Sequence, residues 1–207
     1  MKVAIIDYNA GNLRNVQKAI ERFDVVADII SNGSELIKYD AIVLPGVGSY
    51  FHGMKNLVNL NFKEILKEEV LKEKKPFLGI CLGMQLMGSF GEEGGNSEGL
   101  NLLPFNVKPF DNRKLRLPHI GWNDVKRIKD SVILKNIPDE SDFYFVHSFY
   151  VSDIAKQNIC GTATYGINFP AVIEHKNIFG TQFHPEKSQT YGLLIIKNFL
   201  DFSKRNI

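Results

Sequence analysis

The sequence has few of the residues that mark disulfide-rich, membrane or nucleic-acid-binding proteins. Its 207 residues include only two cysteines, Cys81 and Cys160, which are too few for a disulfide framework. The net charge of +2 gives no reason to expect nucleic acid or an anionic membrane as a partner. No apolar run reaches the length of a membrane span, and the run near the N-terminus is too short for a signal peptide. We therefore expect a cytoplasmic protein without nucleic acid or membrane partners.

Repeats, low-complexity tracts and obvious linkers are also missing, which argues against several structural units. A single domain takes roughly 150 residues, so this length suggests one domain over residues 1–207. The hydrophobic fraction of 44% and the charged fraction of 23% are ordinary for a globular protein. A chain of this length can bury a sizeable core without cross-links.

The first half of the sequence alternates short apolar runs with amphipathic stretches. Strands are expected at 3–6, 25–30, 41–46 and 76–80. Helices are expected at 13–23 and 56–74, with another beginning at Leu82. Continuous apolar strands between amphipathic helices indicate a parallel sheet with helices on both faces.

Strands dominate the second half. They are expected at 101–107, 123–128, 142–151, 161–166, 170–175 and 177–183, with a hairpin turn at EHKN, 174–177. A helix over 191–203 closes the chain. The predicted fold is a single α/β domain with a mostly parallel central sheet, helices on both faces and antiparallel strand extensions in the second half.

Cys81 stands between two glycines in Gly79-Ile80-Cys81-Leu82-Gly83, which fits the G-x-nucleophile-x-G pattern of a nucleophile elbow. At such a turn the nucleophile stands clear of the sheet, and glycine relieves the crowding two residues away on each side. The helix that follows points its positive end at the sulfur and favours the thiolate. The backbone N–H of Leu82 can bind a developing oxyanion. A buried structural cysteine in the same turn is the alternative.

A cysteine nucleophile needs a base, and His184 is the candidate among five histidines. It follows an apolar strand, at the edge where open α/β sheets place their sites. Glu186 comes two residues later, so in an extended segment both side chains face the same way and the carboxylate can orient the imidazole. A solvated His-Pro-Glu loop is the alternative. The other histidines are expected at the surface (His52, His175), in a strand (His147) or without a clear place (His119).

The segment LPGVGS, residues 44–49, ends another expected strand and belongs at the same sheet edge. Its glycines let backbone N–H groups approach a ligand, although a tight loop without function has the same composition. The segment is not a dinucleotide fingerprint, because Phe51 occupies the next required glycine position, and no G-x-x-x-x-G-K occurs.

In order, LPGVG, FLGICLGMQ and FHPE resemble the class I glutamine amidotransferases, which use a Cys-His-Glu triad. Within that class, further stretches from end to end are similar to the glutaminase subunits of imidazole glycerol phosphate synthase, an enzyme of histidine biosynthesis. These stretches are IIDYNAGNLRNV, LPGVGSYFHGM, FLGICLGMQLM, GEEGG, LPHIGWN, YFVHSFYV and FGTQFHPEKSQTYGLLIIKNFL.

The resemblance implies roles for particular residues. Cys81 attacks the side-chain amide of L-glutamine to form a thioester, His184 moves the protons and Glu186 orients it. Val47 and Leu82 supply oxyanion N–H groups, Val47 after the PGVG segment rearranges. The glutamine pocket is implied at Gly48, Gln85, Glu93, His147, Ser148 and Phe149. No metal or cofactor is implied.

The resemblance also implies a partner. Ammonia passes to a (βα)₈-barrel synthase subunit in a heterodimer, where it is used to make imidazole glycerol phosphate and an aminoimidazole carboxamide ribotide. The implied interface includes Asn12, His119, Trp122, Asn123 and Tyr144.

Three positions depart from the common pattern of this family: Asn9, Gly91 and Phe149. They keep open a paralogous glutaminase subunit that supplies ammonia to a sugar amidotransferase of surface-polysaccharide synthesis. A binding module without chemistry and a stand-alone cysteine hydrolase are two rival interpretations. The complete triad argues against the binding module, and PHIGWN with the pocket residues argues against the stand-alone hydrolase.

Overall fold

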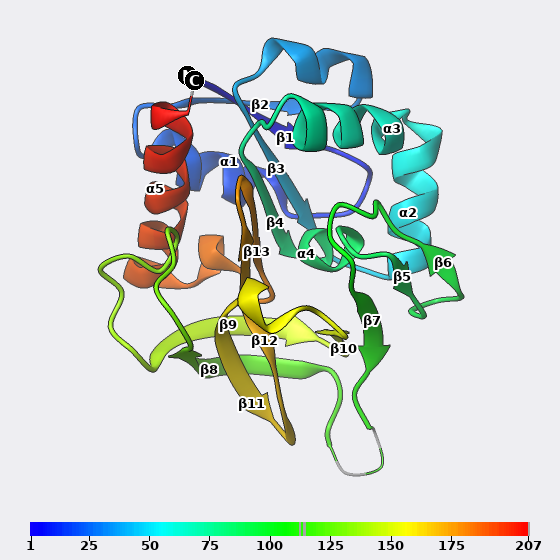
Figure 1. Cartoon of the computed structure of the whole chain (residues 1–207), viewed down its shortest axis with the longest axis vertical. Helices are drawn as coiled ribbons and strands as arrows, with labels where there is room; N and C mark the ends of the chain where they lie inside the picture. The colour runs from blue at the N-terminus through cyan, green and yellow to red at the C-terminus, as the bar shows by residue number, and fades with distance from the viewer. Residues whose placement is uncertain (112, 114, 207) are drawn as a thin grey trace.

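The computed structural model describes residues 1–111, 113 and 115–206. Within these residues, a nine-stranded sheet has the order β2-β1-β3-β4-β13-β12-β11-β8-β9 (Figure 1). Its parallel half consists of β1 (Lys2–Ile6), β2 (Val26–Ile30), β3 (Ala41–Gly46), β4 (Phe77–Cys81) and β13 (Ile178–Thr181). Its antiparallel half consists of β12 (Ile167–His175), β11 (Ile159–Tyr165), β8 (His119–Arg127) and β9 (Ser141–His147).

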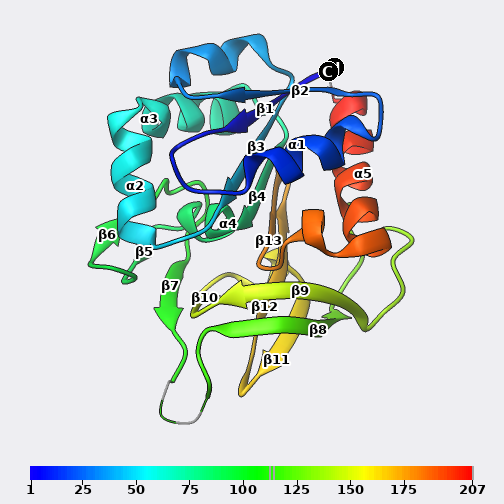
Figure 2. The same cartoon turned by 180° about the vertical axis from the view of Figure 1, so that it is seen from behind.

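Alternate residues of the parallel strands point into two separate hydrophobic clusters. Val3 and Ile5 of β1 pack in one cluster with residues of α1 (Leu13–Glu21) and α5 (Gln189–Arg205). Ala4 and Ile6 pack in the other with residues of α2 (Tyr50–Asn59), α3 (Phe62–Lys67) and α4 (Leu82–Leu86). Because side chains alternate along a strand, a continuously apolar strand can pack against helices on both faces of the sheet. Figure 2 shows α1 and α5 together on one side of the parallel strands.

The fold class predicted from the sequence is therefore confirmed: an α/β fold with a parallel core, helices on both faces and antiparallel strands from the second half. The EHKN hairpin is confirmed as well, because β12 and β13 pair antiparallel on either side of Lys176, which has a φ of 55°. None of the helices in the described ranges is both long and apolar enough to cross a membrane.

The single helix expected over 56–74 was wrong. Helix α2 begins earlier, at Tyr50, and the chain is interrupted at Asn61, whose φ of 58° is left-handed. Helix α3 then runs into a π-helical turn, Glu68–Lys72. The break is held in place by a 3₁₀ turn, Gly33–Lys38, because the Gly33 N–H donates to the Leu60 carbonyl at 3.3 Å. Helical periodicity continues across such a break, so the pattern alone did not reveal it.

The single strand expected over 142–151 was also wrong. It divides at Ser148 into β9 and β10 (Phe149–Ser152), which belong to different sheets. Strand β10 pairs with β7 (Asn106–Pro109) in a four-stranded sheet of the described residues, completed by β5 (Phe90–Gly91) and β6 (Ser97–Glu98). The strand expected over 101–107 was wrong in its bounds, because β7 starts only at Asn106 and continues to Pro109, while Leu102 and Leu103 are buried in irregular chain before it. The change of sheet occurs where Ser148 and Phe149 line the same pocket as Cys81.

Candidate active site

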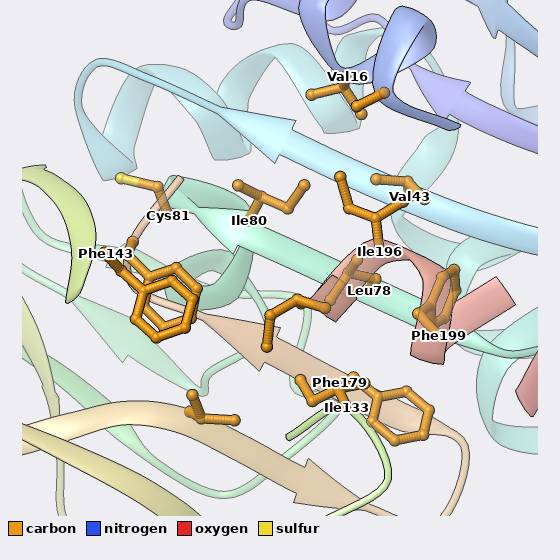
Figure 3. Packing of buried hydrophobic residues seen from close by; sticks show 14 of the residues in the cluster. Val16, Val43, Leu78, Ile80, Cys81, Ile133, Phe143, Phe179, Ile196 and Phe199 are labelled. Carbon is orange, nitrogen blue, oxygen red and sulfur yellow. The ribbon is translucent and has the colours of Figure 1, made fainter. Parts of the chain in front are cut away.

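Cys81 lies at the turn between β4 and α4, with a φ of 54° and a ψ of −109°. A non-glycine residue in this region stores strain of about 1–3 kcal/mol, and such strain is concentrated at functional sites. A Cβ on Gly79 would lie 2.7 Å from the Gly83 carbonyl oxygen, and a Cβ on Gly83 would overlap the Leu44 carbonyl of β3. Both glycines are therefore required by close backbone approach, and the elbow predicted from the sequence is present. Figure 3 shows Cys81 at the end of its strand, beside Ile80 of the core.

His184 and Glu186 form a buried pair. The His184 Nδ1 and Glu186 Oε1 atoms are 2.9 Å apart, and His184 is 2% exposed. The expected extended segment is wrong: His184 is extended, but Pro185–Lys187 forms a 3₁₀ turn. The turn, rather than strand alternation, brings the carboxylate back onto the imidazole.

The imidazole of His184 interacts with both Cys81 and Glu186. Burial lowers the pKa of His184, but the charge and hydrogen-bond interactions with Cys81 and Glu186 outweigh burial and raise this pKa to about 10. Its Nε2 atom is buried and has no hydrogen-bond partner among the described residues. The arrangement favours an imidazolium between Cys81 and Glu186, with Nε2 available for proton transfer.

The two expected oxyanion donors flank Cys81. Gly46 at the end of β3 is in register with Cys81, so Val47 follows directly beside the sulfur-bearing residue. Leu82 is the first residue of α4. Val47 is 41% exposed, and Gly48 has a φ of 100°. A left-handed glycine next to an exposed residue lets this segment change its peptide orientation at low cost.

A pocket of about 340 Å³ opens over Cys81. Every residue expected to bind glutamine lines it, together with Cys81, Val47 and Leu82. Its lining residues are Val47, Gly48, Ser49, Cys81, Leu82, Gln85, Glu93, Pro118, Val146, His147, Ser148 and Phe149. No pattern in the sequence pointed to Pro118 or Val146, which reach the pocket through the antiparallel strands.

Gln182 is a site residue that was not predicted from the sequence. Its Nε2 atom lies 3.8 Å from the Cys81 Sγ atom, and its Oε1 atom accepts a 3.1 Å hydrogen bond from Gln85. Gln85 also donates to the Phe149 carbonyl at 3.0 Å. Gln182 thus links the pocket residue Gln85 to Cys81. The one signal that could have found Gln182 is its place two residues before His184, at the end of the strand that precedes the base.

Two buried histidines are linked behind the pocket. The His147 Nδ1 atom is 2.8 Å from the Phe149 carbonyl oxygen and must donate to it. In the neutral ring, Nε2 of His147 is then an acceptor, so His119 Nδ1, 3.0 Å away, must donate. Burial lowers the pKa of His119 to about 4 and that of His147 to about 3, which keeps both rings neutral. The pair therefore has one fixed tautomeric arrangement.

The expected interface residues do not all face outward. Trp122 is 49% exposed on β8 and packs edge-on to Tyr144 with ring centroids 6.0 Å apart. Asn12 is exposed and Asn123 is half-buried. His119 is 4% exposed and stacks on Tyr165, so its side chain points into the protein. Any contribution of His119 to an interface is therefore indirect.

The departures Asn9 and Gly91 have local physical reasons. Asn9 has a φ of 60°, which glycine adopts freely and asparagine tolerates better than most residues. A Cβ on Gly91 would lie 2.6 Å from the Tyr50 ring, so this position has no room for a side chain. Phe149 lines the pocket, and nothing in the structure explains the loss of the tyrosine hydroxyl there.

Cys160 lies in β11 and is fully buried. Burial, followed by the charge of Glu174, raises the pKa of its thiol to about 11, which keeps it protonated and unreactive. No cluster of three His, Cys, Asp or Glu side chains that could hold a metal ion occurs in the described ranges.

The elbow, the buried His-Glu pair and the pocket define a site for cysteine-mediated acyl transfer. The model of the family "Glutamine amidotransferase class-I" matches residues 4–202, and the chain belongs to this family. Among solved structures, the fold is similar to PurLQS from Thermotoga maritima, with a TM-score of 0.76, 18% identity, and coverage of 97% of this chain and 98% of that one. It is also similar to a glutamine amidotransferase from Thermotoga maritima, with a TM-score of 0.65, 20% identity, and coverage of 99% and 84%.

Within the class, the sequence groups with one kind of subunit. It is 48% identical to imidazole glycerol phosphate synthase subunit HisH 1 of Campylobacter jejuni (strain RM1221), over 96% of this chain and 98% of that protein. It is 47% identical to imidazole glycerol phosphate synthase subunit HisH of Methanocaldococcus jannaschii, over the same shares of the two chains. The resemblance noted from the sequence motifs, both to the class and to this subunit, is confirmed.

The histidine pair generates a first prediction. In His119→Phe the ring stacking is kept, but His147 loses its donor and the Phe149 carbonyl is held less firmly in the pocket. We expect the KM for glutamine to rise by roughly 2- to 10-fold, the equivalent of one hydrogen bond, with a smaller change in kcat. Steady-state glutaminase kinetics measure this. His175→Phe is the control, because it also replaces a histidine by phenylalanine but lies in the β12–β13 hairpin. Its KM and kcat should equal those of the wild type. An unaltered KM in His119→Phe would contradict this role.

Glu93 generates a second prediction. Burial raises the pKa of its carboxyl to about 7. If this carboxylate receives the α-ammonium of glutamine, protonation below pH 7 removes the charge that binds it. We expect KM to rise as the pH falls from 8 to 6, by at most about tenfold per unit. Glu93→Gln should have a high KM across this range without the pH dependence. The same slope in the wild type and in the variant would disprove the assignment.

Proposed function

We propose that this chain is the glutaminase subunit of imidazole glycerol phosphate synthase and hydrolyses L-glutamine to glutamate and ammonia. The observation that carries the proposal is the arrangement at Cys81, where a strained elbow lines a pocket and the His184–Glu186 pair interacts with the cysteine. The identity of 48% to a HisH subunit over nearly the whole chain supports the particular synthase. It disfavours a paralogous subunit that serves a sugar amidotransferase.

The proposed reaction begins with the Cys81 thiolate attacking the side-chain amide carbon of glutamine. A C–S bond forms, and the carbonyl electrons move to an oxygen that accepts hydrogen bonds from the Val47 and Leu82 N–H groups. His184 gives its proton to the amide nitrogen, and the C–N bond breaks. Ammonia departs, and a γ-glutamyl thioester remains on Cys81. His184 then takes a proton from water, which attacks the thioester and releases glutamate. Glu186 holds Nδ1 of His184 throughout.

We further propose that ammonia is handed to a (βα)₈-barrel subunit in a heterodimer. This partner uses it in the lyase reaction that makes imidazole glycerol phosphate and an aminoimidazole carboxamide ribotide. The proposed docking surface includes Asn12, Trp122, Asn123 and Tyr144, with Lys187 lying 5.7 Å from the centroid of the Tyr144 ring. Neither a metal nor a cofactor takes part in the glutaminase step. The two free thiols suit a reducing compartment, so we propose the cytoplasm.

The nucleophile is tested by a pair of cysteine variants. Cys81→Ala should abolish glutamine hydrolysis, while its complex with the barrel partner still turns over on added ammonium salts. Cys160→Ala should keep glutaminase activity, because that thiol is buried and does not line the pocket. Glutamate release and imidazole glycerol phosphate formation are measured separately. Glutamine hydrolysis at the wild-type rate in Cys81→Ala would disprove the assignment.

The partner relationship is tested with the wild-type chain. Alone, it should bind glutamine and hydrolyse it slowly, because we expect the Val47 N–H to face away from the substrate until the partner binds. With the barrel partner and its acceptor nucleotide, kcat should rise by about 10²–10³, the usual effect of one oxyanion donor, with a smaller change in KM. A chain that runs at full rate alone, indifferent to partner and nucleotide, would point to a stand-alone hydrolase.

A further inference from the structure

The hydroxyl of Tyr8 is buried without a hydrogen-bond partner. Tyr8 follows β1 and is 0% exposed, and its Oη atom has no partner in the part of the chain that the structure describes. Its backbone is fixed from α2, because Asn56 Nδ2 donates to the Tyr8 carbonyl at 2.9 Å. An unpaired buried hydroxyl costs about 1–3 kcal/mol, so its presence in a tightly packed place needs an explanation.

This hydroxyl adjoins residues 46–48, here called the oxyanion segment because they include Val47, the proposed oxyanion donor. A Cβ built on Gly46 would overlap the Tyr8 hydroxyl, and the same point is 2.9 Å from the Leu82 Cβ atom and 3.2 Å from the Gly83 nitrogen. The hydroxyl therefore packs between Gly46 and the first turn of α4. These two elements carry the proposed oxyanion donors, Val47 and Leu82. Only a glycine at position 46 leaves space for the tyrosine hydroxyl.

The hydroxyl remains protonated near Cys81. Burial first, and the charge of Cys81 second, raise the pKa of Tyr8 well above its usual range. Tyr8 is therefore a hydrogen-bond donor at every pH at which the enzyme could work. A buried donor beside a segment with a glycine at positions 46 and 48 can pair with a backbone carbonyl once that segment turns.

The geometry of the peptide unit indicates which carbonyl this is. The Gly46 C=O and the Val47 N–H belong to one planar unit and point in opposite directions. Turning the Val47 N–H toward the substrate oxyanion turns the Gly46 carbonyl into the protein, where it needs a donor. We infer that Tyr8 is a positioning residue whose hydroxyl donates to the Gly46 carbonyl and holds the oxyanion segment in its active orientation. This inference rests on the proposed glutaminase function.

Tyr50 is a matched control for Tyr8. It is also 0% exposed, and its hydroxyl also has no partner among the described residues. That hydroxyl packs against Gly99 and is not among the atoms that adjoin Gly46. Burial alone raises its pKa, with no contribution from Cys81. Tyr8→Phe and Tyr50→Phe each remove one hydroxyl from a tyrosine that is 0% exposed. Only the Tyr8 hydroxyl adjoins Gly46.

The experiment compares the wild type with Tyr8→Phe and Tyr50→Phe, each alone and in complex with the barrel partner and acceptor nucleotide. Because both hydroxyls are unpaired, both variants should have a Tm equal to or above that of the wild type. In the complex, Tyr8→Phe should lower the kcat for glutamine by about tenfold, the equivalent of one hydrogen bond, without raising KM. Its slow rate as an isolated chain and its ammonia-dependent synthase rate should match the wild type. Tyr50→Phe should match the wild type in every rate.

Three outcomes would overturn the inference. If the kcat of Tyr8→Phe for glutamine in the complex equals that of the wild type, the Tyr8 hydroxyl is not needed to position the oxyanion segment. An equal loss with and without the partner shows that Tyr8 does not act through the activated conformation. A loss of rate accompanied by a lower Tm or by a lower ammonia-dependent rate shows a structural role. An inactive wild-type complex would instead contradict the proposed function, so the two failures are distinguishable.

Discussion

The left-handed backbone of Cys81 is the constraint on which the rest of the site depends. A φ of 54° at a residue with a side chain is unfavourable and persists only because its surroundings allow no other path. Strand β4 is paired on both sides, with β3 and with β13, so the chain cannot shift along the sheet. Gly83 lies against the Leu44 backbone, and Gly79 lies against Gly83. The paired central strands therefore hold the Cys81 backbone in its strained conformation. This conformation directs the sulfur into the pocket.

The same two neighbouring strands bring the other chemical groups. Strand β3 ends at Gly46, beside Cys81, and leads into the oxyanion segment. Strand β13 runs parallel to β4 and leads, three residues later, to His184. Parallel strands end at the same edge of a sheet, so Cys81, His184 and the Val47 segment meet without any long loop. The neighbouring Cys81 and Glu186 then raise the pKa of the His184 imidazole, which favours its protonated form.

Two polar atoms near Cys81 are buried and unpaired among the described residues, the Tyr8 hydroxyl and the His184 Nε2 atom. Other such atoms lie on Tyr50, Glu69, Thr162 and Glu186. Each costs stability in the resting molecule. The two near Cys81 agree with a site whose hydrogen bonds are completed when substrate binds and the oxyanion segment turns.

Local features of this protein were determined by the sequence alone. Apolar runs and amphipathic stretches indicated the parallel core, and glycines at positions 79 and 83 indicated the elbow, because these signals depend on residues only a few positions apart. Tertiary structure decided the break at Asn61, the change of sheet at Ser148, and the contacts of His119 with His147 and of Gln182 with Cys81. Those contacts join residues 28 and 101 positions apart. They depend on the order of strands in the sheet, which no local preference of the backbone specifies.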